Sequence, residues 1–283
     1  MVAAHALAAM SDATTQTAAK ARPPKSETRD FAEFLLKLAV FVFILRSFII
    51  TPFSIPTESM LPRLLVGDYL IVQKWAYGYS KHSLPFSLPL FDGRVLTRLP
   101  ERGDVAVFKA PPGHKVDYIK RVIGLPGDLV EVRDGQIILN GQAVKRVPTG
   151  EFILPVTPNS PCFSPAFTSA GRDGTTECRY PRYVETLPGG RSYATIDIGP
   201  TQADDTQVYT VPAGQLFFMG DNRDQSADSR FPPVEGRGIG LVPIDNLVGR
   251  AWFSVFSTDG SANWLLPWTW FTAARWERIG AGF

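Results

Sequence analysis

One stretch limits the possible folds of this chain more than any other, an apolar run of 20 residues that reads FAEFLLKLAVFVFILRSFII from Phe31 to Ile50. A helix that crosses a bilayer needs about 20 mostly apolar residues. Lys37 and Arg46 lie toward the ends of the run, where long side chains can reach the membrane interfaces. We therefore predict a transmembrane helix over residues 31–51, after a disordered tail over residues 1–30 that is poor in apolar surface.

Basic residues precede this run, namely Lys20, Arg22, Lys25 and Arg29. By the positive-inside rule they favour a cytoplasmic N-terminus, with the rest of the chain outside the cytoplasm. A cleaved signal peptide would have a shorter apolar region and a small-residue cleavage site, which residues 51–54 do not supply. A buried amphipathic helix remains an open alternative, because Lys37 and Arg46 interrupt the apolar run.

The rest of the chain has the composition of a mainly β protein. Its 24 glycines and 24 prolines indicate many turns and short strands. Apolar runs bounded by Gly-Asp turns recur over residues 67–75, 103–108 and 116–128. Residues 147–208 are dominated by Pro, Gly, Thr and Ser, and they resemble an insertion that forms a smaller β subdomain.

Charge and metal-binding residue types exclude several functions. A net charge of +2 with scattered basic residues gives no nucleic-acid footprint. Three histidines leave little material for a metal site, and we expect no metal or cofactor. Cys162 and Cys178 are not spaced like a zinc or redox motif. They are either free thiols or, outside the cytoplasm, a disulfide that would contribute roughly 3 kcal/mol.

Two hydroxyls, Thr57 and Ser59, lie between Pro56 and Pro62, which restrict the backbone around them. Ser59 could simply cap a short helix. As a nucleophile it would need a base within hydrogen-bond reach. No histidine lies where a rigid base is expected, although His114, in a turn before a strand, stays open.

Lys120 is the other candidate base, and its neighbours in sequence are mainly apolar. Burial would lower its pKa from about 10.4 toward the range where the amine accepts a proton. The alternative is a lysine on the exposed face of a strand.

Residues 221–230 form a dense polar loop that lacks the glycine and distal Glu of a calcium-binding EF-hand. Hydrogen-bonded turns and an ion pair are expected there, and Ser226 could orient a lysine.

Four separated motifs occur together in one order. They are Ile55-Pro56-Thr57-Glu58-Ser59-Met60, Gly67-Asp68-Tyr69-Leu70-Ile71-Val72, Tyr118-Ile119-Lys120-Arg121 with Gly124-Leu125-Pro126-Gly127-Asp128, and Gly220-Asp221-Asn222-Arg223-Asp224 continuing to Arg230. In this combination the chain resembles the bacterial type I signal peptidases, membrane-bound Ser/Lys proteases that remove signal peptides. The motifs frame residues 55–230, and the apolar run before them also fits that family.

The resemblance implies an antiparallel β catalytic core over residues 52–146 and 209–283, with 147–208 as the inserted β subdomain. It implies that Ser59 is the nucleophile, that Lys120 is the general base, and that Thr57 joins the Ser59 N–H in the oxyanion hole. The remaining residues with implied roles are Ser226, which orients the lysine, the structural ion pair Asp228 and Arg230, and the pocket residues Phe53, Ile55, Pro56, Tyr118 and Ile119.

The implied substrates are precursor proteins that carry signal peptides, cleaved after small residues in an Ala-x-Ala-like pattern. The implied location is the bacterial inner membrane, with a single pass through the lipid bilayer and the catalytic domain on the periplasmic or outer face. Two alternatives stay open. One is a specialised Ser/Lys peptidase that matures a single partner, and the other is a non-catalytic, membrane-anchored β binding module.

Overall fold

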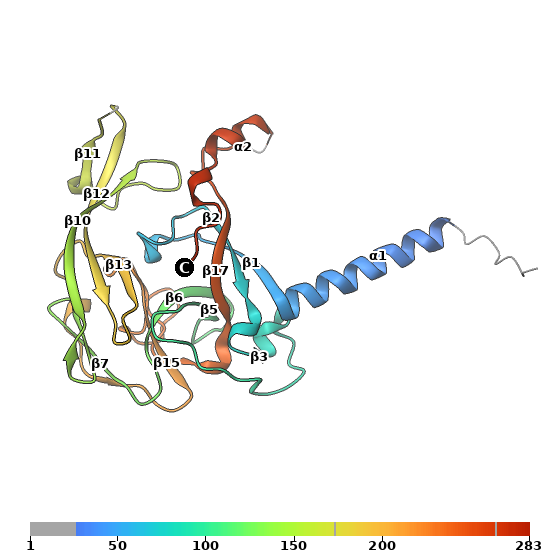
Figure 1. Ribbon diagram of the computed structural model, residues 1–283, viewed down its shortest axis with the longest axis horizontal. Helices are drawn as coiled ribbons and strands as arrows, with labels where there is room; N and C mark the ends of the chain where they lie inside the picture. Colours follow the sequence, from blue (N-terminus) through green and yellow to red (C-terminus); the bar gives the residue numbers. More distant parts are fainter. Residues whose placement is uncertain (1–26, 173, 264) are drawn as a thin grey trace, which may run out of the picture. The chain divides into compact units, whose positions relative to one another are not determined.

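The computed structural model describes residues 27–172, 174–263 and 265–283 (Figure 1). The chain divides into two compact units, Met1–Phe41 and Val42–Phe283. In the first unit the described residues belong to helix α1 (Glu27–Ile44), which has Glu27 and Asp30 in its first turn. In the part of the chain that the structure describes, no helix has both the length and the apolar character needed to cross a membrane.

The helix differs from the predicted one at both ends. It begins at Glu27, inside the predicted tail, and residues 1–26 of that tail lie outside the described residues. At the other end a π-helical turn, η1 (Leu45–Ile49), leads into strand β1 (Ile50–Ser54). Residues 50 and 51 were predicted to be helical, but β1 pairs antiparallel with β2 and its sheet hydrogen bonds replace the helical ones.

The prediction of a mainly β protein is confirmed, and the described residues form several antiparallel sheets. The largest has seven strands within the described part of the chain. Its strands are, in order across the sheet, β1, β2 (Asp68–Gln73), β17 (Leu247–Ser257), β5 (Val105–Lys109), β6 (Asp117–Gly124), β15 (Gln215–Met219) and β16 (Val242–Pro243).

A second sheet, which Figure 1 shows in green and yellow, is built around two long strands that lie side by side. Its strands are β10 (Lys145–Pro155), β12 (Thr176–Thr186), β11 (Thr168–Ala170) and β13 (Ser192–Ile196). The smaller sheets are built from β14 (Tyr209–Thr210), β7 (Leu129–Arg133), β8 (Gln136–Leu139) and β9 (Gln142–Ala143), and from β3 (Tyr79–Ser80) with β4 (Arg94–Val95). The boundaries predicted for the inserted subdomain stay a prediction.

Short helical turns connect these strands. The described turns are η2 (Glu58–Met60), η3 (Lys74–Ala76), η4 (Lys81–Ser83), η5 (Pro85–Ser87), η6 (Pro165–Phe167), η7 (Gln202–Asp204), η8 (Ile244–Asn246) and η9 (Trp276–Arg278), and helix α2 (Trp268–Ala273) precedes the last of them.

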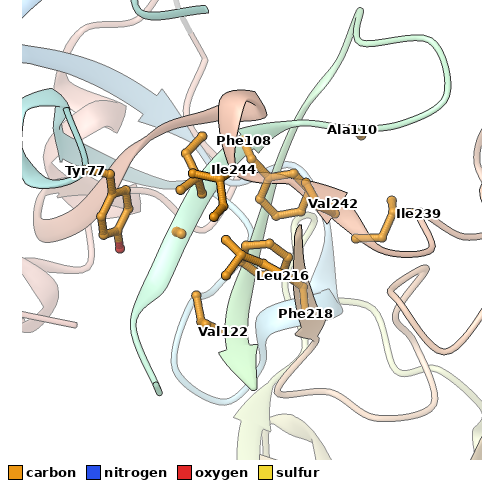
Figure 2. Packing of buried hydrophobic residues seen from close by; sticks show 11 residues of the cluster. Tyr77, Phe108, Ala110, Val122, Leu216, Phe218, Ile239, Val242 and Ile244 are labelled. Carbon is orange, nitrogen blue, oxygen red and sulfur yellow. The ribbon is translucent and has the colours of Figure 1, made fainter. Parts of the chain in front are cut away.

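A buried apolar cluster fixes the middle of the large sheet (Figure 2). The rings of Phe108 on β5 and Phe218 on β15 stack with their centroids 4.3 Å apart. Val122, on the strand between them, is fully buried in the same cluster. Burial of each large apolar side chain contributes roughly 1.5–3 kcal/mol. Strand β6 is therefore held rigidly from both sides, two residues away from Lys120.

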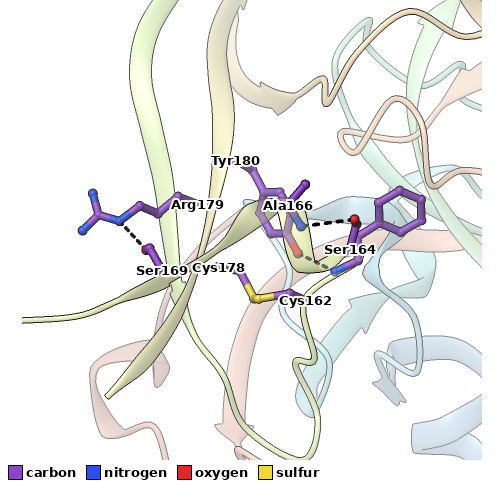
Figure 3. The surroundings of a disulfide bond; sticks show 8 residues. Cys162, Ser164, Ala166, Ser169, Cys178, Arg179 and Tyr180 are labelled. Atoms are coloured by element: carbon purple, nitrogen blue, oxygen red, sulfur yellow. Dashed lines mark hydrogen bonds between the residues drawn. A yellow bond between two sulfur atoms is a disulfide. The ribbon is translucent and has the colours of Figure 1, made fainter. Parts of the chain in front are cut away.

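A disulfide bond joins Cys162 to Cys178 on β12, which resolves the alternative that the sequence left open (Figure 3). Beside it the hydroxyl of Tyr180 accepts a hydrogen bond from the N–H of Phe163 at 3.0 Å. Cys178 is fully buried in an apolar cluster that also contains Leu61 and Tyr180. The bond thus ties an irregular loop to the same cluster that packs against the segment after Ser59.

Loss of this disulfide is expected to destabilise the protein. A bridge with a sequence separation of 16 contributes about 3 kcal/mol on the chain-entropy model. We expect the double variant Cys162→Ala/Cys178→Ala to lose about that much free energy of unfolding, as measured by urea denaturation. Reductant should shift the midpoint of the parent protein and leave that of the double variant unchanged. Equal midpoints for the oxidised parent and the variant would contradict this expectation.

Candidate active site

Ser59 lies in the short 3₁₀ turn η2 and is buried, with 6% of its surface exposed. Thr57 before the turn has an extended backbone, and Leu61 after it is extended as well. Met60 and Leu61 are fully covered by two different apolar clusters. The apolar residues after Ser59 therefore anchor the turn in the core, so that the hydroxyl has a fixed position.

The structure brings Lys120 and Ser59 together. Lys120 Nζ lies 2.5 Å from Ser59 Oγ and 3.1 Å from the carbonyl oxygen of Ile119. The lysine side chain is 4% exposed, although it is a residue type that is rarely buried. It projects from β6, where it pairs in register with Ala106 of β5. The sequence did not decide whether Lys120 is buried or exposed. In the structure its side chain is buried against Ser59.

Burial lowers the pKa of the Lys120 amine from 10.5 to about 8. The carboxylates of Asp228 and Asp221 oppose this shift, and the guanidinium of Arg230 assists it. Desolvation has the larger effect, because it penalises the charged form of the amine. Near pH 8 a large fraction of the amine is therefore uncharged and able to accept a proton from Ser59.

The side chain of Thr57 lies next to that of Ser59, with 3.4 Å between the two hydroxyl oxygens. Thr57 is exposed whereas Ser59 is buried, so the pair lies at the boundary between solvent and the core. Because the protein does not cover Thr57 at this boundary, its hydroxyl can donate to the carbonyl group of a bound substrate. The oxyanion role of Thr57 stays a prediction.

Ser226 is buried near the site, where its hydroxyl helps to lower the pKa of the neighbouring Asp228 carboxylate. Its proximity follows from Gly220, where a Cβ atom would lie 2.3 Å from Ser226 Oγ and 2.5 Å from the carbonyl oxygen of Ser59. The Ser226 hydroxyl makes no hydrogen bond with Lys120 within the described residues. Its orienting role stays a prediction.

Asp228 and Arg230 form a buried ion pair. Arg230 Nε lies 2.9 Å from Asp228 Oδ1, and the N–H of Gly220 donates to Asp228 Oδ2 at 2.9 Å. Burial alone raises the pKa of Asp228, but Arg230 and the hydrogen bonds outweigh it and bring the pKa below its ordinary value. The carboxylate is thus charged and holds the polar loop next to the lysine.

Sequence reasoning missed a second ion pair, between Arg121 and Asp221. Its two hydrogen bonds measure 2.7 and 2.6 Å, and both side chains are almost fully buried. Arg121 follows Lys120 on a strand, so the two side chains point to opposite faces of the sheet. In the sequence, this strand alternation and the acidic loop 221–230 indicated that Arg121 could pair with an acidic residue of the loop. They could not identify Asp221 as that residue.

Asn222 belongs to the fourth sequence motif, in which it was given no role of its own. Its N–H donates to the carbonyl oxygen of Ser59 at 3.1 Å, and its side-chain amide donates to that of Glu58 at 3.2 Å. The polar loop therefore binds the main chain of the serine turn directly. This loop sets the distance between the strand that carries Lys120 and the turn that carries Ser59.

The predicted pocket residues have different environments. Ile55 and Ile119 are 2% and 5% exposed and belong to one apolar cluster, against which Phe53 packs. Tyr118 is partly buried, and its ring centroid lies 5.4 Å from Lys120 Nζ. Pro56 is exposed. Their roles in substrate binding stay predictions.

The histidines are engaged elsewhere. His114 Nδ1 lies 2.9 Å from the amide nitrogen of Asn246, and His82 Nδ1 lies 3.0 Å from Ser87 Oγ. Neither ring makes a hydrogen bond with Ser59 within the described residues. The described part of the chain also contains no group of three or more His, Cys, Asp or Glu side chains that could hold a metal ion.

Comparison with known proteins places this chain in one family. A family model described as signal peptidase, peptidase S26, matches residues 28–256. A signal peptidase I from Rickettsia typhi is 39% identical over 243 residues, which cover 83% of this chain and 82% of the relative. One from Rickettsia prowazekii is 37% identical with the same coverage.

A crystal structure of a signal peptidase I from Enterococcus faecalis V583 is 24% identical with a TM-score of 0.28, and the match covers 54% of this chain and 97% of that chain. The family model and the relatives define a serine peptidase. The chain belongs to the signal peptidase family, peptidase S26.

Gly220→Ala is expected to lower peptidase activity by about 10²-fold, because the added methyl group would displace Ser226 and the Ser59 main chain together. A misplacement of about 1 Å at a catalytic group typically costs that much. The measurement is kcat/KM for a precursor peptide, with thermal unfolding as a check on the fold. Gly113→Ala is the matched control, since nothing lies within 4 Å of its added Cβ. Equal activity in both variants would contradict the proposed spacing role of Gly220.

Proposed function

We propose that this protein is an endopeptidase that cleaves signal peptides from exported precursor proteins with a Ser59/Lys120 dyad. One observation carries the proposal: the buried Lys120 amine, with a pKa of about 8, lies 2.5 Å from the Ser59 hydroxyl. A nucleophile and a base within hydrogen-bond reach are the requirement for covalent catalysis by serine. The relatives named signal peptidase I supply the substrate class.

The reaction begins when Ser59 Oγ attacks the scissile carbonyl carbon and Lys120 Nζ takes the hydroxyl proton. Negative charge then develops on the carbonyl oxygen, where Thr57 Oγ1 and the N–H of Ser59 act as donors. Removal of one such donor typically costs 10²–10³ in rate. Lys120 returns the proton to the leaving amine as the peptide bond breaks. Water, deprotonated by the same lysine, then hydrolyses the ester formed with Ser59 and releases the signal peptide.

The substrate is proposed to bind extended, as an added strand. Strand β15 pairs with β6 only from Arg121 to Gly124, so residues 117–120 have β5 on one side and no paired strand on the other within the described structure. Ile119 lies on this edge, and its side chain is buried with that of Ile55 in one apolar cluster, which we propose as the filled floor of the binding groove. A filled floor favours small residues before the scissile bond, as in an Ala-x-Ala pattern.

The proposed location is the bacterial inner membrane, with the apolar run of α1 as the anchor and the N-terminus in the cytoplasm. Large apolar side chains of α1 are exposed, among them Phe31 at 61%, Phe34 at 57% and Phe41 at 63%. The Cys162–Cys178 disulfide favours an oxidising compartment for the catalytic part of the chain. Both observations support a catalytic unit on the outer face of the membrane.

Cleavage of a precursor by the full chain tests the proposal. Ser59→Ala and Lys120→Met should each abolish processing, because one removes the nucleophile and the other removes the base. His114→Ala should retain activity, since His114 contacts Asn246 and not Ser59. Gel analysis of precursor and mature protein gives the result. Full activity of Lys120→Met with loss in His114→Ala would show that the base is the histidine.

The pH dependence of kcat/KM should follow the ionisation of Lys120. The protonated amine cannot accept the Ser59 proton, so activity should rise with pH and reach half its maximum near the lysine pKa of about 8. Below that pH it should fall about tenfold per unit. The measurement is hydrolysis of a fluorogenic precursor peptide between pH 6 and 10. A midpoint near 6.5, typical of histidine, would contradict a lysine base.

A further inference from the structure

The residues after η9 form an additional extended segment along β17, at the end of the chain marked C in Figure 1. The N–H of Gly280 donates to the carbonyl oxygen of Ser254 at 2.8 Å, and the N–H of Phe283 donates to that of Trp252 at 3.2 Å. An antiparallel bridge also pairs this segment with β17 at Phe253. Residues 280–283 are therefore held in place by sheet-like hydrogen bonds.

Arg63 holds the same segment from the side of the serine turn. Its guanidinium donates a hydrogen bond to the carbonyl oxygen of Gly282 and lies 5.6 Å from the centroid of the Phe283 ring. Burial lowers the pKa of Arg63 and Arg121 lowers it further, whereas Asp221 opposes the shift. The guanidinium thus lies within electrostatic reach of the buried ion pair next to Lys120.

The ring of Phe283 packs against the apolar cluster that contains Ile55 and Ile119. Phe53 is the other partly buried side chain that packs against this cluster. Phe53, Ile55 and Ile119 all belong to the predicted substrate pocket. Phe283 is itself only partly buried, so part of this residue is accessible to solvent.

We propose that the Phe283 ring, clamped by Arg63, forms one wall of the substrate pocket and limits the size of the residues accepted before the scissile bond. This inference rests on the proposed signal peptidase function. Strand β17 binds the main chain of this segment, and the Arg63 guanidinium lies against the Phe283 ring, so a large aromatic side chain is held on the surface of that cluster. Phe283 touches the substrate rather than the reacting atoms, so it determines specificity without taking part in proton transfer.

The test compares full-length Phe283→Ala with the parent on paired precursor peptides that carry Ala or Val at the first or third residue before the cleaved bond. Hydrophobic pockets discriminate one or two methyl groups by about 10–200-fold. We expect the preference for Ala over Val, as a ratio of kcat/KM, to fall about tenfold at one of these positions. The change should arise mainly in KM, and the pH profile should keep its midpoint.

Arg63→Gln provides a second variant, because it loosens the segment without removing the ring, and it should shift the same ratio less. Phe271→Ala is the matched control, since that ring is 68% exposed and stacks on Trp276. It should leave the ratio unchanged. If both Phe283→Ala and Arg63→Gln keep the Ala/Val ratio and the cleavage activity of the parent, Phe283 does not form a wall of the substrate pocket. Absence of cleavage by the parent would instead overturn the proposed function.

Discussion

The contact between the buried amine of Lys120 and the hydroxyl of Ser59 is the interaction on which the rest of the structure depends. Lowering the pKa of a lysine from 10.5 to about 8 corresponds to roughly 3 kcal/mol of unfavourable desolvation. Folding must supply that free energy from elsewhere. The apolar clusters on both sides of β6, and those around Met60 and Leu61, are where it is supplied.

The charged groups around the lysine are arranged so that they do not cancel this desolvation. Asp228 and Asp221 would stabilise an ammonium ion, but each is engaged by its own arginine, Arg230 or Arg121. A buried carboxylate with a close cationic partner exerts a weaker field on a third group. The two ion pairs therefore have two effects. They hold the polar loop against the Ser59 turn, and they leave the Lys120 amine able to lose its proton.

Much of this was predictable from the sequence, and the exceptions have physical causes. Alternating apolar runs and turn residues predicted the mainly β fold, and the resemblance of four motifs indicated Ser59 and Lys120. The end of α1 at Ile44 was missed, because residues 50–51 take their hydrogen bonds from a distant strand rather than from local propensity. The pairing of Arg121 with Asp221 spans 100 residues, and no local pattern specifies such a contact.

Direct titration of the Lys120 amine is the measurement that tests this account most closely. Lysine side chains labelled with ¹³C at Cε report the pKa of each amine by NMR, and the Lys120→Met and Lys74→Met variants assign the two signals that are expected near pH 8. The account predicts that the Lys120 signal titrates with a pKa of about 8. A pKa near 10.5 for Lys120 in the folded protein would contradict it.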